Sequence, residues 1–112
     1  MTRDHERLRD ILEYGERIRR HTGPGRAVLD DEVVAAAVTR WMEVIGEAAG
    51  AVSAELRADY PEVAWRDLVG MRNILAHAYR RVNLDLVWRA VERLPEIERQ
   101  VADILAQEER PS

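Results

Sequence analysis

Cysteine is missing from this 112-residue chain, and so are long hydrophobic runs. Without cysteine the chain can hold no disulfide, thiolate-bound zinc, cysteine-bound iron–sulfur cluster or cysteine nucleophile. The longest uninterrupted apolar run covers residues 33–38, far fewer than the roughly 20 residues that cross a bilayer. The first ten residues carry mixed charges, where an export signal needs an apolar stretch of about 7 to 15 residues. We therefore expect a cytoplasmic protein that does not enter a membrane.

Lysine is also absent, and all 17 basic residues are arginine. Arginine-biased codon usage would explain this, but arginine is also the side chain best suited to holding phosphate through two parallel hydrogen bonds. The positions of the arginines are more informative than their number. Four arginines and one aspartate lie in residues 65–81, although the whole chain has a net charge of −4. A basic segment in an acidic chain favours a local anion site over general coating of nucleic acid.

The spacing of apolar residues predicts four helices in one domain that covers residues 1–112. Apolar positions recur at steps of three and four over residues 4–20, 31–58, 65–78 and 83–105, which is the period of an amphipathic helix. Asp30 or Asp31 can cap the second helix and Asn83 the fourth, while Pro95 bends the fourth by removing a hydrogen bond. Because short loops place neighbouring helices antiparallel, we predict an all-α, antiparallel up-and-down four-helix bundle.

Tryptophan and glycine add two expectations about packing. Phenylalanine is absent, so Trp41, Trp65 and Trp88 are the expected large core side chains, with base stacking as the alternative role. Gly46 and Gly50 lie four residues apart in the second helix, each at a cost of about 1 kcal/mol relative to alanine. Close approach of another helix would explain their presence.

The residues with most potential for chemistry lie near the end of the third predicted helix. His5 and His21 lie near the ends of the first helix, where a solvated or dipole-stabilised histidine is ordinary. His77 instead follows Arg72 and Asn73 in the basic segment. A helix advances about 100° per residue, so residues 73 and 77 share a face, whereas residue 72 lies about 140° from residue 77.

Arg72 and His77 can therefore meet in three ways. The long Arg72 side chain can wrap past Asn73, the helix can fray before His77, or the two groups can meet across the two-fold axis of a dimer. The third way predicts a homodimer with a shared cleft.

An arginine and a histidine are the minimum equipment for RNA cleavage without a metal. The ribose 2′-hydroxyl supplies the nucleophile, so the enzyme provides only proton transfer and charge stabilisation. The structural alternative is a histidine at the negative end of a helix, with Arg72 paired to a carboxylate. No spacing of histidine with aspartate or glutamate matches a metal motif, so we expect neither metal nor cofactor. Glu43 and Glu47 are expected on a solvated face or beside Arg72.

The segment around these residues resembles the HEPN superfamily, and within it the HepT-like toxins of the HEPN and minimal-nucleotidyltransferase toxin–antitoxin systems. The resemblance covers roughly residues 30–105. It is carried by Gly70-Met71-Arg72-Asn73-Ile74-Leu75-Ala76-His77-Ala78-Tyr79, by Ile45-Gly46-Glu47-Ala48, by Tyr60-Pro61 with Trp65, and by the stretch from Val82-Asn83 to Val87-Trp88.

This resemblance implies a HEPN-like homodimeric bundle with metal-independent endoribonuclease activity on transfer RNA or messenger RNA. Arg72 would bind the phosphate and stabilise the transition state, and His77 would be the general acid or base. Asn73 would help to arrange the site. We add Glu47 as an orienting partner.

The resemblance also implies a regulatory role for Tyr79, as the acceptor of an AMP group transferred by a cognate minimal nucleotidyltransferase antitoxin in a type VII toxin–antitoxin system. A negatively charged AMP group two residues from His77 would block the cleft and repel the RNA phosphate. An ordinary hydrogen-bonded tyrosine of the bundle is the structural alternative. For the whole protein, the alternatives are a non-catalytic helical adaptor or nucleotide-binding subunit of such a transferase, and a plain dimerisation bundle.

Overall fold

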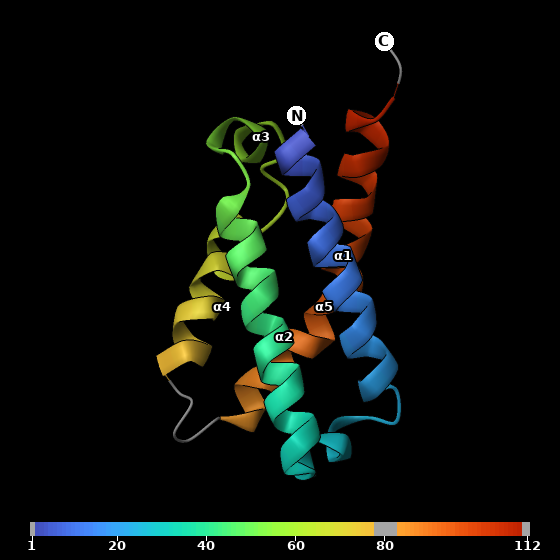
Figure 1. Ribbon diagram of the computed structural model, residues 1–112, viewed down its shortest axis with the longest axis vertical. Helices are drawn as coiled ribbons and strands as arrows, with labels where there is room; N and C mark the ends of the chain where they lie inside the picture. Colours follow the sequence, from blue (N-terminus) through green and yellow to red (C-terminus); the bar gives the residue numbers. More distant parts are fainter. Residues whose placement is uncertain (1, 78–82, 111–112) are drawn as a thin grey trace.

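The computed structural model describes residues 2–77 and 83–110, and all regular structure in these ranges is helical, as predicted (Figure 1). The elements are α1 (Thr2–Thr22), the short 3₁₀ helix η1 (Arg26–Asp30), α2 (Glu32–Ala51), α3 (Ala54–Asp59), α4 (Trp65–His77) and α5 (Leu84–Glu108). The molecule is elongated, with extents of 48 × 27 × 20 Å. Within the described ranges, no helix combines the length and apolar character needed to cross a membrane.

The second helix is shorter than predicted, because the segment expected to form one helix over residues 31–58 is divided. α2 ends before Val52, which has extended backbone, and Ser53 caps the separate helix α3. The buried carboxylate of Asp4 in α1 accepts hydrogen bonds from the Ser53 N–H at 2.9 Å and from its hydroxyl at 2.6 Å. This contact between distant parts of the chain stabilises the break, so the described residues form five α-helices instead of the four predicted.

Other predicted helix boundaries agree with the structure. The carboxylate of Asp31 accepts hydrogen bonds from two backbone N–H groups in the first turn of α2, and Asn83 caps α5 in the same way. Gly25, in the loop that follows α1, has a φ of 114°, a conformation that favours glycine. α5 continues through Pro95 as one helix, and Figure 1 shows it curving along its length.

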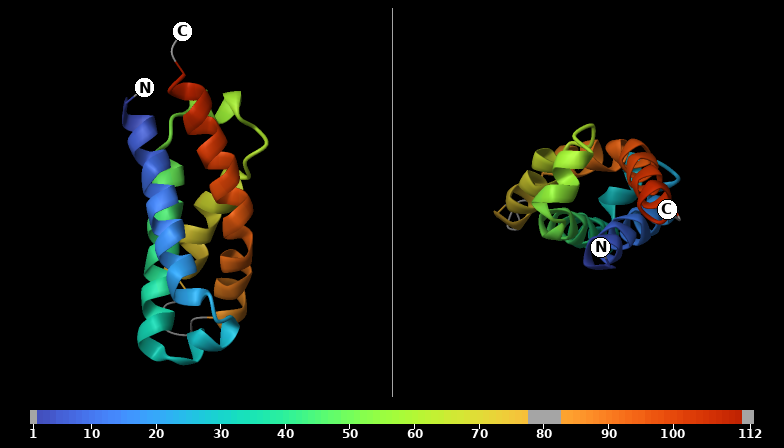
Figure 2. Two further views of the ribbon diagram at one scale, coloured as in Figure 1. Left: turned by 90° about the vertical axis from the view of Figure 1, so that its right-hand side faces the viewer. Right: turned by 90° about the horizontal axis from the view of Figure 1, so that it is seen from above.

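α2 is the central helix of the fold, since it packs against α1 on one side and against α4 on another, while α1 also packs against α5 (Figure 2). The core side chains come mainly from α1, α2 and α5, and each fully buried aliphatic side chain contributes roughly 1.5–3 kcal/mol. They include Leu8, Ile11, Ile18, Val38, Met42, Ile45, Val87, Leu94, Val101 and Ile104. Trp65 is buried as predicted, whereas Trp41 and Trp88 are only partly buried at the edge of this core.

Candidate functional site

Arg72 lies where α4 packs most closely on α2. A Cβ atom added to Gly46 would lie 2.8 Å from the Cβ of Arg72 and 2.9 Å from the carbonyl oxygen of Leu68. Such distances are too short for real carbon atoms, so only glycine at position 46 allows α4 to approach this closely. At Gly50 the same added atom would lie 3.7 Å from a methyl group of Val69, which is ordinary contact. The predicted close approach of a second helix is therefore confirmed, and it is tightest at Gly46.

The Arg72 side chain extends along α2 towards the C-terminal end of that helix. Its Nη1 atom is 4.0 Å from the Cβ position of Gly50, in the last turn of α2. This turn has no basic residue of its own, and the negative end of a helix dipole favours a guanidinium nearby. None of the ion pairs found within residues 2–77 and 83–110 involves Arg72. The guanidinium is thus placed by packing and by the helix end.

α4 remains helical through His77, so the helix does not fray before that residue. The helical register then separates residue 77 from Arg72 by about 140° around the axis. Because the Arg72 side chain lies against α2 and extends towards Gly50, it does not wrap forward past position 73. The described residues therefore do not bring Arg72 and position 77 to one side of α4. The side chains of Asn73 and His77, and all of Tyr79, lie outside the described part of the chain.

Among the described residues, Glu47 forms an ion pair with Arg40 and none with Arg72. Arg40 lies between the two carboxylates of the predicted pair, with its Nη1 atom 3.2 Å from Glu43 and 3.4 Å from Glu47. Glu47 also lines a shallow pocket with residues of α1, whereas the preceding residue, Gly46, faces α4. Glu43 is the less exposed of the two, at 19% against 48% of its side chain. The structure therefore places Glu47 on the α1 side of α2, away from the Arg72 contact.

The two histidines of α1 differ in their surroundings. His21 is exposed, its Nδ1 atom lies 2.8 Å from the carbonyl oxygen of Arg17, and its ring lies 5.1 Å from that of Trp41. His5 is half-buried, and its Nε2 atom has no hydrogen-bond partner among the described residues. In the described part of the chain no three histidine, aspartate or glutamate side chains converge as a metal site would require.

Comparison with known families relates this geometry to an enzyme class. A family model described as Ribonuclease HepT-like matches residues 11–104. The chain belongs to the HepT-like ribonuclease family. The family resemblance predicted from the motif around Arg72 and His77 is thereby confirmed for this HepT-like chain.

Individual relatives agree with the family. The HepT-like chain is 38% identical over 79 residues, 70% of each chain, to Putative RNase TTE0752 of Caldanaerobacter subterraneus subsp. tengcongensis. It is 35% identical over 95 residues to Probable ribonuclease HepT of Thermococcus cleftensis, covering 82% of this chain and 86% of the relative. It is 32% identical over 97 residues to Putative RNase MJ1380 of Methanocaldococcus jannaschii, covering 86% and 84%. No solved structure gives a significant match.

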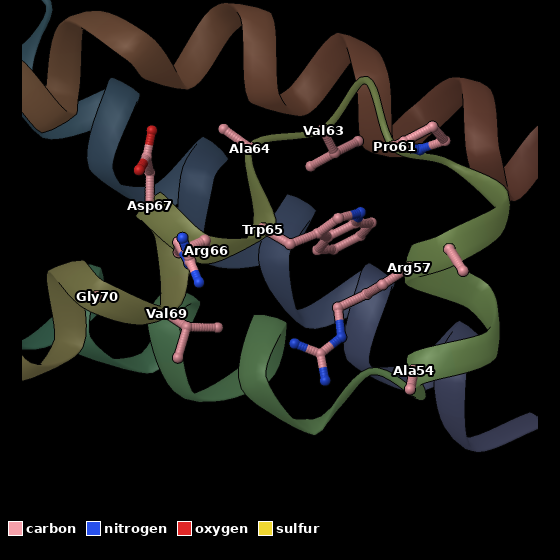
Figure 3. Close-up of a pocket in the computed structure, with 11 residues that line it drawn as sticks. Ala54, Arg57, Pro61, Val63, Ala64, Trp65, Arg66, Asp67, Val69 and Gly70 are labelled. Carbon is pink, nitrogen blue, oxygen red and sulfur yellow. The ribbon is translucent and has the colours of Figure 1, made fainter.

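The HepT-like chain also has a groove that the sequence did not reveal, between α3 and the first turns of α4. We call it the α3–α4 groove, and its volume is about 870 Å³ (Figure 3). Its lining residues are Ala54, Arg57, Ala58, Pro61, Val63, Ala64, Trp65, Arg66, Asp67, Val69 and Gly70. Arg66 belongs to the predicted basic segment, but no local pattern singled out Arg57. The groove exists because the chain breaks at Val52 and folds α3 back beside α4.

The turn that borders this groove is held by two aromatic side chains. The indole N–H of Trp65 donates a hydrogen bond to the carbonyl oxygen of Tyr60 at 2.9 Å. The Tyr60 hydroxyl donates to a carboxylate oxygen of Glu108 in α5 at 2.7 Å, and this bond raises the pKa of Tyr60 to about 12. The edge of the groove is therefore tied to both α4 and α5.

Proposed function

We propose that this HepT-like chain is the toxin of a type VII toxin–antitoxin system, a metal-independent endoribonuclease whose catalytic residues are Arg72 and His77. Two chains would bring their motifs together in one cleft between the subunits, where Asn73 helps to arrange the site. The substrate would be transfer RNA or messenger RNA. The protein would act in the cytoplasm.

The observation that carries the proposal is the combination of family membership with the position of Arg72 on α4. Family membership supports ribonuclease chemistry. The contact with Gly46 holds the Arg72 backbone at the α2–α4 interface, and the helix continues unbroken to His77. Because residues 72 and 77 are on different sides of one straight helix, a shared site between two subunits accounts for both features.

The proposed reaction needs only proton transfer and charge stabilisation. One His77 imidazole takes the proton of the ribose 2′-hydroxyl, and the 2′-oxygen attacks the adjacent phosphorus. The bond from phosphorus to the 5′-oxygen breaks, and that oxygen takes a proton from solvent, to which His77 returns the proton that it accepted. The products are a 2′,3′-cyclic phosphate and a 5′-hydroxyl. The Arg72 guanidinium would stabilise the negative charge that develops on the phosphate oxygens in the transition state.

Inhibition would act on the same cleft. A minimal nucleotidyltransferase antitoxin would transfer AMP from ATP to the Tyr79 hydroxyl, two residues after His77, with release of pyrophosphate. The added phosphate and nucleoside would fill the cleft and repel the RNA backbone.

The test compares RNA cleavage by wild type, His77→Ala and Arg72→Ala. We expect losses of about 10²–10⁴-fold for the histidine variant and of about 10²–10³-fold for the arginine variant. His21→Ala and Arg20→Ala are matched controls on exposed positions of α1 and should cleave like wild type. The substrate is a transfer RNA transcript, and a chelator is present to remove metal ions. The assay identifies the cyclic phosphate end of the product. DNA of the same sequence is tested as a comparison substrate.

Three outcomes would count against the proposal. Equal cleavage by wild type and His77→Ala would remove His77 from the chemistry. A dependence on added magnesium would contradict the metal-independent mechanism. The absence of any cleavage by pure wild type would favour a non-catalytic adaptor for the nucleotidyltransferase.

A further inference from the structure

We infer that the α3–α4 groove binds the sugar–phosphate backbone of an RNA strand beside the cleaved phosphodiester, with Arg57 and Arg66 as its phosphate-binding residues. This inference rests on the proposed ribonuclease function and adds a second binding region to it. Of the motif from Gly70 to Tyr79, only Gly70 lines this region among the described residues.

The geometry of Arg57 is the first observation. Its side chain extends from α3 into the groove towards Val69, with the Trp65 indole above it (Figure 3). The Nε atom of Arg57 is buried and has no hydrogen-bond partner among the described residues. A buried N–H group without a partner is costly in a folded protein. No carboxylate pairs with this guanidinium among the described residues, so its charge remains available to a phosphate in the groove.

The charge of the groove is the second observation. Asp67 is the one acidic residue among the groove residues given above, and its carboxylate lies 3.7 Å from the Nη2 atom of Arg93 in α5. The ion pairs of the described residues include neither Arg57 nor Arg66. The rest of the lining is apolar except for backbone. The lining therefore carries one more guanidinium than carboxylate, and its carboxylate is paired with Arg93, which suits a polyanion better than a second copy of this acidic chain.

The position of the groove relative to Arg72 is the third observation. Val69 lines the groove, and its methyl groups lie 3.7 and 3.8 Å from the Cβ position of Gly50, which the Arg72 Nη1 atom approaches to 4.0 Å. The groove therefore adjoins the guanidinium of Arg72. Residues 66 and 72 are about 9 Å apart along the α4 axis, a distance that a strand of a few nucleotides spans. One RNA strand can thus reach both regions.

The test measures how RNA binding depends on salt. The probe is a fluorescent 20-nucleotide RNA of mixed sequence with 2′-O-methyl groups, which cannot be cleaved because the nucleophile is blocked. Each phosphate contact to a single strand contributes about 0.7 to the slope of log Kd against log salt. We expect Arg57→Gln and Arg66→Gln each to lower this slope by about 0.7 and to weaken binding about fivefold at 0.1 M salt. Arg57→Lys should keep the slope, because it keeps the charge.

The control is Arg20→Gln, which removes the same charge from an exposed position of α1 outside the groove and should leave the slope unchanged. Arg66 is exposed, so its variant carries the test if Arg57→Gln does not fold, as thermal melting will show. Slopes of both variants equal to that of Arg20→Gln would overturn the inference. A change from dimer to monomer in sedimentation would overturn it as well, because a second copy would then cover the groove.

These results can be separated from those of the cleavage assay. If the groove variants bind RNA with unchanged slopes while Arg72→Ala loses cleavage, the proposed function is retained and only RNA binding in the groove is rejected. A wild type that binds the probe but cleaves no RNA would reject the ribonuclease, while the slopes would still report whether the groove holds RNA.

Discussion

At the scale of single residues, Arg72 combines a structural contact with a chemical group. Its Cβ atom and backbone lie against Gly46, and its guanidinium extends to the end of α2. Arg72→Ala keeps the Cβ atom that lies against Gly46 and removes the two outer methylenes together with the guanidinium, so the variant should keep the closest contact between α2 and α4. A loss of cleavage in this variant would therefore report on phosphate binding and not on unfolding.

Tyr79 is the residue on which the proposed inhibition depends. Tyr79→Phe removes the hydroxyl that would accept AMP and leaves the ring. We expect this variant to cleave RNA like wild type but to resist inhibition, because no phosphate can be attached at this position. The measurement is growth of cells that express each toxin with its nucleotidyltransferase, together with the mass of the purified toxin.

Tyr60→Phe is the matched control for this prediction, since Tyr60 is bonded to Glu108 on another part of the molecule. We expect Tyr60→Phe to be modified like wild type, so its measured mass should increase by that of one AMP group. Inhibition of Tyr79→Phe to the same degree as wild type would show that the acceptor is elsewhere.

At the scale of elements, the packing of α4 on α2 depends on one glycine. Gly46→Ala gains helix propensity of up to about 1 kcal/mol, but its methyl group would meet the Leu68 carbonyl oxygen at 2.9 Å, which is backbone and cannot turn away. We expect a net loss of about 1–3 kcal/mol in the free energy of unfolding, as in other overpacked interiors. Denaturant unfolding measures it.

Gly50→Ala is the control on the same helix, one turn later. Gly50 is exposed, and an added Cβ atom there would meet Val69 at an ordinary 3.7 Å. This variant should be more stable than wild type by about 0.5–1 kcal/mol, because alanine restricts the unfolded chain. Equal effects of the two substitutions would mean that α4 does not approach α2 most closely at position 46.

The helix boundaries and the groove differ in how far they can be predicted from the sequence. Asp31 and Asn83 mark helix starts because a cap acts on backbone groups two or three residues away. The break at Val52 was missed, since its partner, Asp4, lies 49 residues from Ser53 in the chain. The α3–α4 groove depends on that break and was missed for the same reason. Arg72 and His77 could be proposed from the sequence because their motif is local, whereas the side of α2 that carries Glu47 is fixed only by the packing of α1 and α4.

At the scale of the whole molecule, α4 is attached to the fold mainly through α2. A helix that packs on one side leaves its other side for a partner or a ligand. The register separates residues 72 and 77 by about 140°, so one subunit alone does not bring their positions to one side. A two-fold axis would repeat both residues and allow the guanidinium of one subunit to meet the imidazole of the other.

This arrangement makes a prediction about mixed dimers. Arg72→Ala and His77→Ala are each inactive alone, but a mixed dimer keeps one arginine and one histidine on opposite subunits, so one composite pair remains. After the two variants are unfolded together and refolded, about half of the dimers should be mixed, and RNA cleavage should return to a measurable fraction of wild type. In the control, each variant is refolded separately, and the two are then mixed under conditions in which subunits do not exchange. This mixture should give no activity. If the refolded mixture is as inactive as its parents, although differently tagged subunits purify together, then both groups must come from the same chain.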